Sequence, residues 1–215
     1  MFTRSALALL LAPLCLAACA HAPSARSSEE AWDVTAARGS AQEIDFVTQE
    51  GTWMSVDVSP DGRWLVFDLL GHVYRVSVAG GDAECLTQES GIALNYHPRF
   101  SPDGEWIAFV SDRGGQDNLW LMRADGSEAR AVFLDETARV SQPAWTPDGA
   151  SIAVRRVALG EGFGSDRNEI WLMPREGGAG SALVDEEQPD ASWPSVSRDG
   201  RSLYFHVANR SFEAA

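Results

Sequence analysis

The chain has 215 residues, of which 31 are acidic and 17 are basic, all of them arginine, so its formal net charge is −14. Proteins that bind nucleic acid normally present a basic surface, so this composition argues against a nucleic-acid partner. The length is sufficient for one or two domains with a substantial core. Of the three cysteines only Cys85 lies beyond residue 19, which excludes an internal disulfide in the rest of the chain.

The first 18 residues have the features of an export signal. Arg4 precedes an apolar run, residues 6–16, that is too short for a permanent transmembrane helix. The following Leu16-Ala17-Ala18-Cys19 resembles a bacterial lipobox, in which the cysteine becomes the lipidated first residue. We therefore expect lipidation at Cys19, with plain signal cleavage as the alternative. Ala20 resembles the residue found in lipoproteins sent to the outer membrane, which implies a periplasm-facing protein of the cell envelope held by its lipid anchor alone.

Residues 19–43 are predicted to be a flexible tether, because they are rich in Ala, Ser, Glu and Arg without apolar periodicity. Folded structure is expected to start at a strand over residues 44–47. The sequence thus predicts three parts, which are a lipoprotein signal peptide (1–18), a tether (19–43) and a folded domain (44–215).

A four-residue turn motif recurs through the folded part. The first copy is Ser59-Pro60-Asp61-Gly62, and the Asp–Gly step returns after 42, 45 and 51 residues. Ser or Thr, Pro, Asp and Gly in this order suit a type I turn. The fourth copy has Arg198 in place of Pro. The repeat-turn residues are Asp61 and Gly62, Asp103 and Gly104, Asp148 and Gly149, and Asp199 and Gly200.

Strand-like runs surround each turn and repeat with it. Runs such as 64–67 and 106–110 follow the turn, a second run and a hairpin turn come next, and a further run precedes the turn. About four antiparallel strands per 40–50 residues are typical of a β-propeller blade. We expect an all-β fold with three full blades, over residues 52–88, 94–135 and 140–185, and part of a fourth from residue 191.

The pattern over Pro98–Asp112 resembles the repeats of TolB-like β-propellers. The run 58–71 resembles more particularly the propellers placed ahead of exported bacterial amidohydrolases. Related propellers also precede the catalytic domains of prolyl-oligopeptidase-type and tricorn-type peptidases. The resemblance covers residues 44–207 and implies an incomplete TolB-like propeller, in which the leading strand would pair with the last blade to close the ring.

No residue of the chain is predicted to be catalytic, and no cofactor or metal is expected. The histidines, at positions 21, 72, 97 and 206, form neither His-x-His nor His-Glu-x-x-His, and Gly-x-Ser-x-Gly is absent. The turn aspartates are explained by turn chemistry. Asp166 with Glu161 is a weaker calcium candidate. Cys85 is expected to be a small buried side chain, and the strand tryptophans 64, 106, 120 and 171 to pack between blades.

Three functional classes remain open. The chain can be the non-catalytic N-terminal propeller of a larger amidohydrolase-type hydrolase, gating or positioning substrate. It can be a TolB-like propeller that binds envelope proteins without catalysis, or a defective fragment. Its expected partners are accordingly missing C-terminal blades, a catalytic domain beyond Ala215, or envelope proteins.

Overall fold

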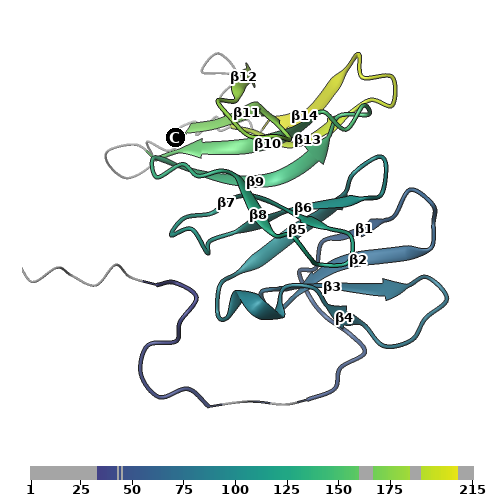
Figure 1. Ribbon diagram of the computed structural model, residues 1–215. Coiled ribbons are helices and arrows are strands. Elements are labelled where there is room, and N and C mark those ends of the chain that lie inside the picture. Colours follow the sequence, from purple (N-terminus) through teal and green to yellow (C-terminus); the bar gives the residue numbers. More distant parts are fainter. Residues whose placement is uncertain (1–32, 43, 45, 160–166, 185–189, 208–215) are drawn as a thin grey trace, which may run out of the picture. The chain divides into compact units, whose positions relative to one another are not determined.

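The structure is a computed structural model that describes residues 33–207 except 43, 45, 160–166 and 185–189. Its regular elements are almost all β-strands (Figure 1). In chain order they are β1 (Val56–Val58), β2 (Trp64–Leu69), β3 (His72–Ser77), β4 (Glu84–Cys85), the short 3-10 helix η1 (Gln88–Ser90), β5 (Asn95–Phe100), β6 (Trp106–Ser111), β7 (Asn118–Arg123), β8 (Arg130–Phe133), β9 (Ala138–Trp145), β10 (Ser151–Ala158), β11 (Arg167–Pro174), β12 (Ser181–Val184), β13 (Ala191–Val196) and β14 (Leu203–Val207).

Consecutive strands pair antiparallel into separate sheets. Three sheets have four strands, in the orders β1-β2-β3-β4, β5-β6-β7-β8 and β9-β10-β11-β12, and the pair β13-β14 forms the fourth. We call them blades 1 to 4. The expected all-β fold, with three full blades and part of a fourth, is confirmed by this topology.

The repeated turn joins the first strand of each blade to the second. In blade 1 the Gly62 amide donates to the Ser59 carbonyl at 2.8 Å, and the Ser59 hydroxyl accepts the Trp64 amide at 2.9 Å. The turn glycine has φ between 66° and 75° in all four copies, a region that favours glycine. Local chemistry alone therefore fixes the point at which each blade reverses direction.

Alternation along the second strand gives each blade two different faces. In blade 2, Ile107 and Phe109 lie six and eight residues after the turn serine and point toward blade 1, whereas Ala108 points toward blade 3; all three are fully buried. We call the face carrying the sixth and eighth residues the backward face. The face carrying the seventh residue is the forward face.

The hydrophobic core consists of layers between these faces. Val66 and Val73, on the forward face of blade 1, pack against the backward face of blade 2. Ala108 and Leu121 pack in the same way against blade 3, and Ala153 against blade 4. The predicted inter-blade packing of tryptophans holds for Trp106, Trp120 and Trp171, which border these layers, whereas Trp64 is 36% exposed.

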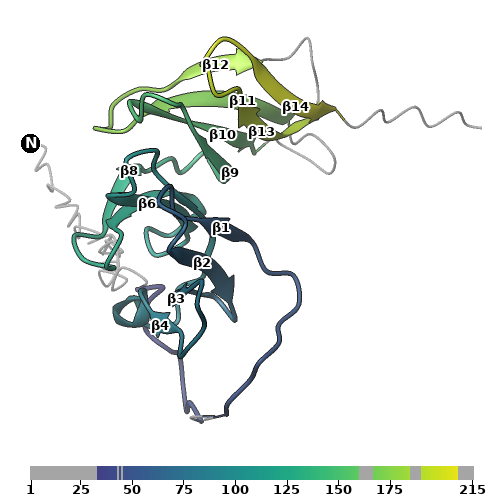
Figure 2. The ribbon, with the colours of Figure 1, turned by 90° about the vertical axis from the view of Figure 1, so that its right-hand side faces the viewer.

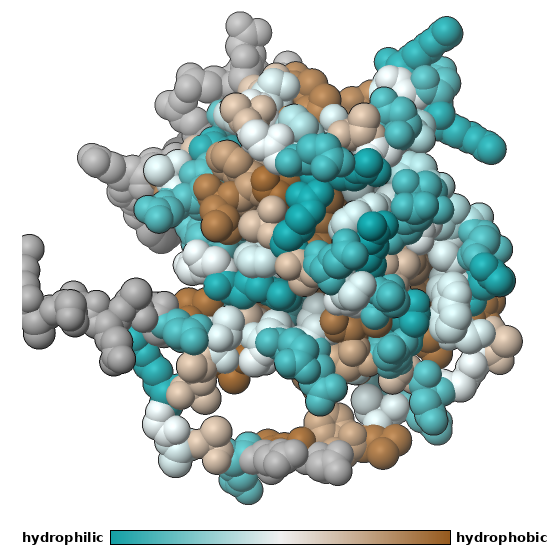
Figure 3. Space-filling view, in the orientation of Figure 1, coloured by the Kyte–Doolittle hydropathy of each residue, from teal (hydrophilic) through white to brown (hydrophobic). Residues whose placement is uncertain are grey.

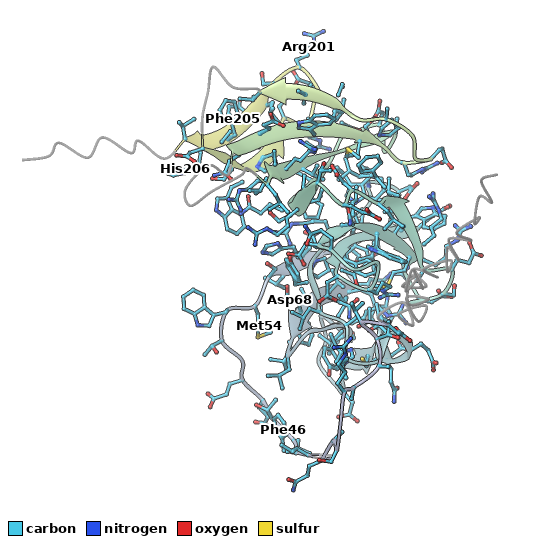
Figure 4. The ribbon with its side chains drawn as sticks, turned by 90° about the vertical axis from the view of Figure 1, so that its left-hand side faces the viewer. Phe46, Met54, Asp68, Arg201, Phe205 and His206 are labelled. Atoms are coloured by element: carbon cyan, nitrogen blue, oxygen red, sulfur yellow. The ribbon has the colours of Figure 1, made fainter. Side chains whose placement is uncertain are left out.

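The segment before β1 differs from its prediction. Ile44, Phe46 and Val47 are exposed and lie outside any strand, in a long loop that Figures 1 and 2 show running away from blade 1. Brown, hydrophobic residues are visible in this loop at the bottom of Figure 3, and Figure 4 shows Phe46 in the part of the loop that lies away from the sheets. The strand expected over 44–47 is wrong for the three described residues, Ile44, Phe46 and Val47, because no described strand pairs with them.

Within the described residues, no helix has the length and apolar character that crossing a membrane requires.

Candidate functional site

The inner strands β5, β9 and β13 share an unusual backbone feature. His97, Gln142 and Trp193 each stand directly before a proline, and each has a φ of 55°. Each lies at a β-bulge where the register with the neighbouring strand shifts. Left-handed backbone at non-glycine residues costs free energy and tends to be retained at functional sites. Each of these three inner strands therefore turns one side chain in a new direction at its bulge.

At two of these bulges, a side chain of the preceding blade accepts the backbone amide. The His97 amide donates to Asp68 Oδ2 of blade 1 at 2.7 Å, while Asp68 Oδ1 accepts the Ser55 amide at 2.8 Å. The Trp193 amide donates to Gln142 Oε1 of blade 3 at 2.7 Å. A largely buried carboxylate and a largely buried amide thus tie successive inner strands together.

A cavity of about 360 Å³ opens where the inner strands converge. All four blades line it, through Asp57, Arg99, Phe100, Gln142, Pro143, Ala144, Trp145, Trp193, Pro194, Ser195 and Val196. The Trp193 ring meets the His97 ring edge-on at 5.7 Å, which joins blade 4 to blade 2 although blade 3 separates them in sequence. We call this cavity the axial pocket.

The axial pocket offers both charge signs and an aromatic surface. Asp57 accepts the Phe100 amide at 2.8 Å, and the Arg99 guanidinium donates to the Pro98 carbonyl at 2.7 Å. Trp193 is 54% exposed. Burial lowers the pKa of His97, so its imidazole is neutral near pH 7. An arginine, a carboxylate and an exposed indole suit a ligand that carries both polar and apolar groups, such as a peptide.

Catalytic machinery is not evident in the part of the chain that the structure describes. No group of three or more His, Cys, Asp or Glu side chains there is placed to hold a metal ion. The axial pocket combines Asp57 and Arg99 with Gln142 and Trp193, and Ser195 is its only hydroxyl side chain. Such a set can bind and orient a ligand, whereas covalent catalysis would need an activated nucleophile with an adjacent base.

The predicted turn residues lie at the four turns, one pair per blade. Each turn aspartate accepts the hydroxyl of the Ser or Thr two residues before it, and the amide two residues after it. These hydrogen bonds lower the pKa of Asp61 to about 2, the Ser59 hydroxyl being the main cause, and also lower the pKa of Asp148 and Asp199. The pKa of Asp103 is lowered by Ser101 and Glu105 although burial opposes the shift. The turn hydrogen bonds are Ser59 to Asp61, Ser101 to Asp103, Thr146 to Asp148 and Ser197 to Asp199.

Other predicted positions divide into two groups. Cys19, Glu161 and Asp166 lie outside the described residues. Cys85 is half-buried in β4, so it is more accessible than a core cysteine.

Sequence reasoning missed the axial pocket, although the recurrence of proline three residues before three of the four turns was a readable signal for the bulges.

Comparison with known families decides the chain's class. The model of the TolB beta propeller domain matches residues 36–163, more than half of the chain. The chain belongs to the TolB beta propeller domain family. The resemblance noted in the repeats is thereby confirmed.

Individual relatives of this TolB-type propeller are much longer proteins. The chain is 49% identical over 108 residues to the uncharacterized peptidase YuxL of Bacillus subtilis, and 32% identical over 153 residues to tricorn protease homolog 1 of Streptomyces coelicolor. The matches cover 49% and 66% of this chain but only 14% of each relative. A putative TolB from Agrobacterium tumefaciens is similar in structure, with a TM-score of 0.58 and 26% identity, over 71% of this chain and 53% of that one.

Proposed function

We propose that this chain is the non-catalytic propeller module of a larger exported bacterial hydrolase, and that its axial pocket gates or positions the substrate of a catalytic domain. The proposal rests on how short this chain is compared with its relatives. Two relatives named as a peptidase and a protease match the chain over only 14% of their own length. The shared segment is thus one module of much longer proteins. The described residues of this chain also form the axial pocket, which contains no evident nucleophile–base pair.

Two observations bear on the class of the catalytic domain. The run 58–71 resembles propellers of exported amidohydrolases, and this favours an amidohydrolase-type domain. The names of the relatives favour a peptidase. Both classes cleave C–N bonds of amides, so the axial pocket would serve the same purpose, which is to admit or hold an amide-containing chain ahead of the reaction.

A second candidate is supported by the structural likeness to TolB. In that case the propeller binds an envelope protein and no catalytic domain is attached. The same surface would be used, because Trp193 and Arg99 provide the aromatic and cationic side chains that are enriched in protein interfaces.

We also propose where the protein is located in the cell. The lipobox-like Leu16–Cys19 and Ala20 support a lipoprotein of the outer membrane that faces the periplasm. Mass spectrometry of the mature N-terminus tests this, with a lipidated Cys19 as the expected result. An unmodified Cys19, or cleavage at another bond, would contradict it.

The direct test uses the natural polypeptide, isolated from its bacterium with antibodies raised against this chain. We expect a protein heavier than 23.3 kDa, the mass of the 215 residues, that hydrolyses amide or peptide substrates. Trp193→Ala should change turnover of long substrates more than that of short ones, whereas Leu183→Ala, an exposed apolar control in β12, should change neither. A polypeptide of about this mass without hydrolase activity, retained on an envelope protein through Trp193, would favour the second candidate instead.

A further inference from the structure

Arg175 of blade 3 reaches the repeated turn of blade 2. It directly follows β11, and its amide donates to the Ala150 carbonyl at 3.0 Å. Its Nη1 lies 3.8 Å from Asp103 Oδ2 of the second turn, and its side chain is half-buried. A cationic side chain of one blade is thus held beside the turn carboxylate of the preceding blade.

The equivalent position of blade 2 is Ala124. Its amide donates to the Glu105 carbonyl at 2.9 Å, and Glu105 directly follows its turn glycine as Ala150 does in blade 3. A methyl group cannot extend to Asp61 of the first turn as the Arg175 side chain extends to Asp103. A cavity of about 530 Å³, a size typical of ligand pockets, lies between these two turns of blades 1 and 2. We call it the turn groove, and the residues of its lining used below are Asp61, Trp64, Arg75, Glu105 and Ala124.

The tryptophan of the turn groove also differs from its counterpart in blade 2. Trp64 and Trp106 each lie five residues after a turn serine, on the forward face. The guanidinium carbons of Arg123 and Arg130 lie 4.1 Å and 5.6 Å from the centre of the Trp106 ring. In blade 1 the same register positions are held by Ser77 and Glu84.

Arg75 contacts Trp64 but leaves part of its ring open. The Arg75 guanidinium carbon lies 4.5 Å from the centre of the ring. Its nitrogens are held in place by the Ala124 carbonyl and by Glu84 Oε2, both at 2.7 Å. Trp64 is nevertheless 36% exposed. An exposed indole beside carboxylates suits a planar cation, because a guanidinium can stack on the ring while its N–H groups face the carboxylates.

The carboxylates of the turn groove can accept a further donor. Asp61 Oδ2 accepts Arg63 Nε at 2.6 Å, and Glu105 Oε2 lies 3.4 Å from Arg123 Nη1. The side chains of Arg63 and Glu105 are largely exposed. Ion pairs at such exposed positions contribute little free energy, so an incoming guanidinium can join them or replace one partner.

We propose that the turn groove binds an arginine side chain of a partner polypeptide, which stacks beside Trp64 and pairs with the carboxylates of Asp61 and Glu105. The guanidinium takes the place that Arg175 occupies beside Asp103 one blade further on. Arginine is favoured over lysine because its planar fork of donors can stack on an indole and reach two carboxylates together. The formal net charge of −14 attracts such a basic partner. The turn groove is a different cavity from the axial pocket, so this inference is independent of the proposed function.

Titration of the full chain with argininamide, followed by NMR of the tryptophan indole N–H groups, provides the test. The Trp64 signal is assigned from a Trp64→Phe variant. It should shift saturably with a dissociation constant on the order of 1 mM, as expected for so small a ligand. Citrullinamide has nearly the same shape without the positive charge. It should bind about tenfold more weakly, because it makes no charge-assisted hydrogen bonds to the carboxylates.

Two variants locate the binding in the turn groove. Ala124→Arg gives blade 2 the arginine that blade 3 has at this position, and it should raise the dissociation constant for argininamide about tenfold because the groove is then occupied. Ala182→Arg, the same substitution at an exposed position of β12, is the matched control and should leave the constant unchanged. Glu105→Gln alters an exposed side chain without endangering the fold and should raise the constant about threefold. Circular dichroism and thermal unfolding show whether each variant keeps the fold.

The outcomes that overturn the proposal are equally defined. It is overturned if argininamide does not shift the Trp64 signal, or if citrullinamide shifts it at the same concentrations. It is also overturned if neither Ala124→Arg nor Glu105→Gln weakens binding, or if Ala182→Arg weakens it as much as Ala124→Arg does.

Discussion

Blades 1 and 2 have the same topology and nearly the same residue types on their backward faces, yet those faces have different environments. Phe67 and Phe109 both lie eight residues after a turn serine, but Phe109 is fully buried and Phe67 is half-buried. This difference in burial comes from the presence of a neighbouring blade and not from the sequence of the blade itself. In a repeat protein each unit buries its apolar face only by stacking on the next unit.

The largest effect on stability is expected for truncation of Phe109, compared with the same truncation of Phe67. Phe109→Ala should lower the free energy of unfolding by about 3–5 kcal/mol, because it leaves a cavity in a closed layer. Phe67→Ala should cost roughly 1 kcal/mol, since water already reaches that side chain. Urea unfolding of both variants measures the difference. Equal losses would mean that the two faces are equally covered.

Removing a turn hydroxyl should lower the free energy of unfolding by a smaller amount. Ser101 is fully buried, and its hydroxyl accepts the Trp106 amide at 2.9 Å. Ser101→Ala should therefore cost about 1–3 kcal/mol, the range for leaving a buried donor unsatisfied. Ser197 makes the equivalent bond to the Ser202 amide at 2.9 Å but is only half-buried, so water can replace its hydroxyl. Thermal unfolding should show the smaller loss for Ser197→Ala, and the reverse order would contradict this account.

The smallest effect is expected for the loss of stability in acid. The pKa of Asp61 falls from 3.8 to about 2 on folding, so its contribution to stability is complete above pH 4 and is lost as the pH falls toward 2. Burial raises the pKa of Asp117 above its usual value, by contrast, so its protonation in acid does not destabilise the fold. Melting temperatures between pH 5 and 2 should fall less steeply for Asp61→Asn than for the unchanged chain. Parallel curves would show that the turn carboxylate is not responsible.

Sequence reasoning recovered what depends on local chemistry. The turns at Asp61, Asp103, Asp148 and Asp199 and the strands around them were predictable, because Pro and Gly fix the backbone and apolar runs fix the strands. The strand expected over 44–47 was not formed, since pairing requires a neighbouring edge. The recurring proline was a readable signal for the bulges at His97, Gln142 and Trp193. The axial pocket, which Gln142 and Trp193 help to line, depends on contacts between blades and could not be predicted from any single repeat.

The most direct test of the account is the solvent accessibility of equivalent methyl groups in the intact chain. Methyl NMR signals recorded with a soluble paramagnetic agent report which side chains the solvent reaches. We predict strong broadening for Val58, Leu65 and Val76 on the backward face of blade 1, and little for Ile107, Met122 and Ile152 at the equivalent buried positions. Equal protection of both sets would contradict the claim that the backward face of blade 1 is open to solvent.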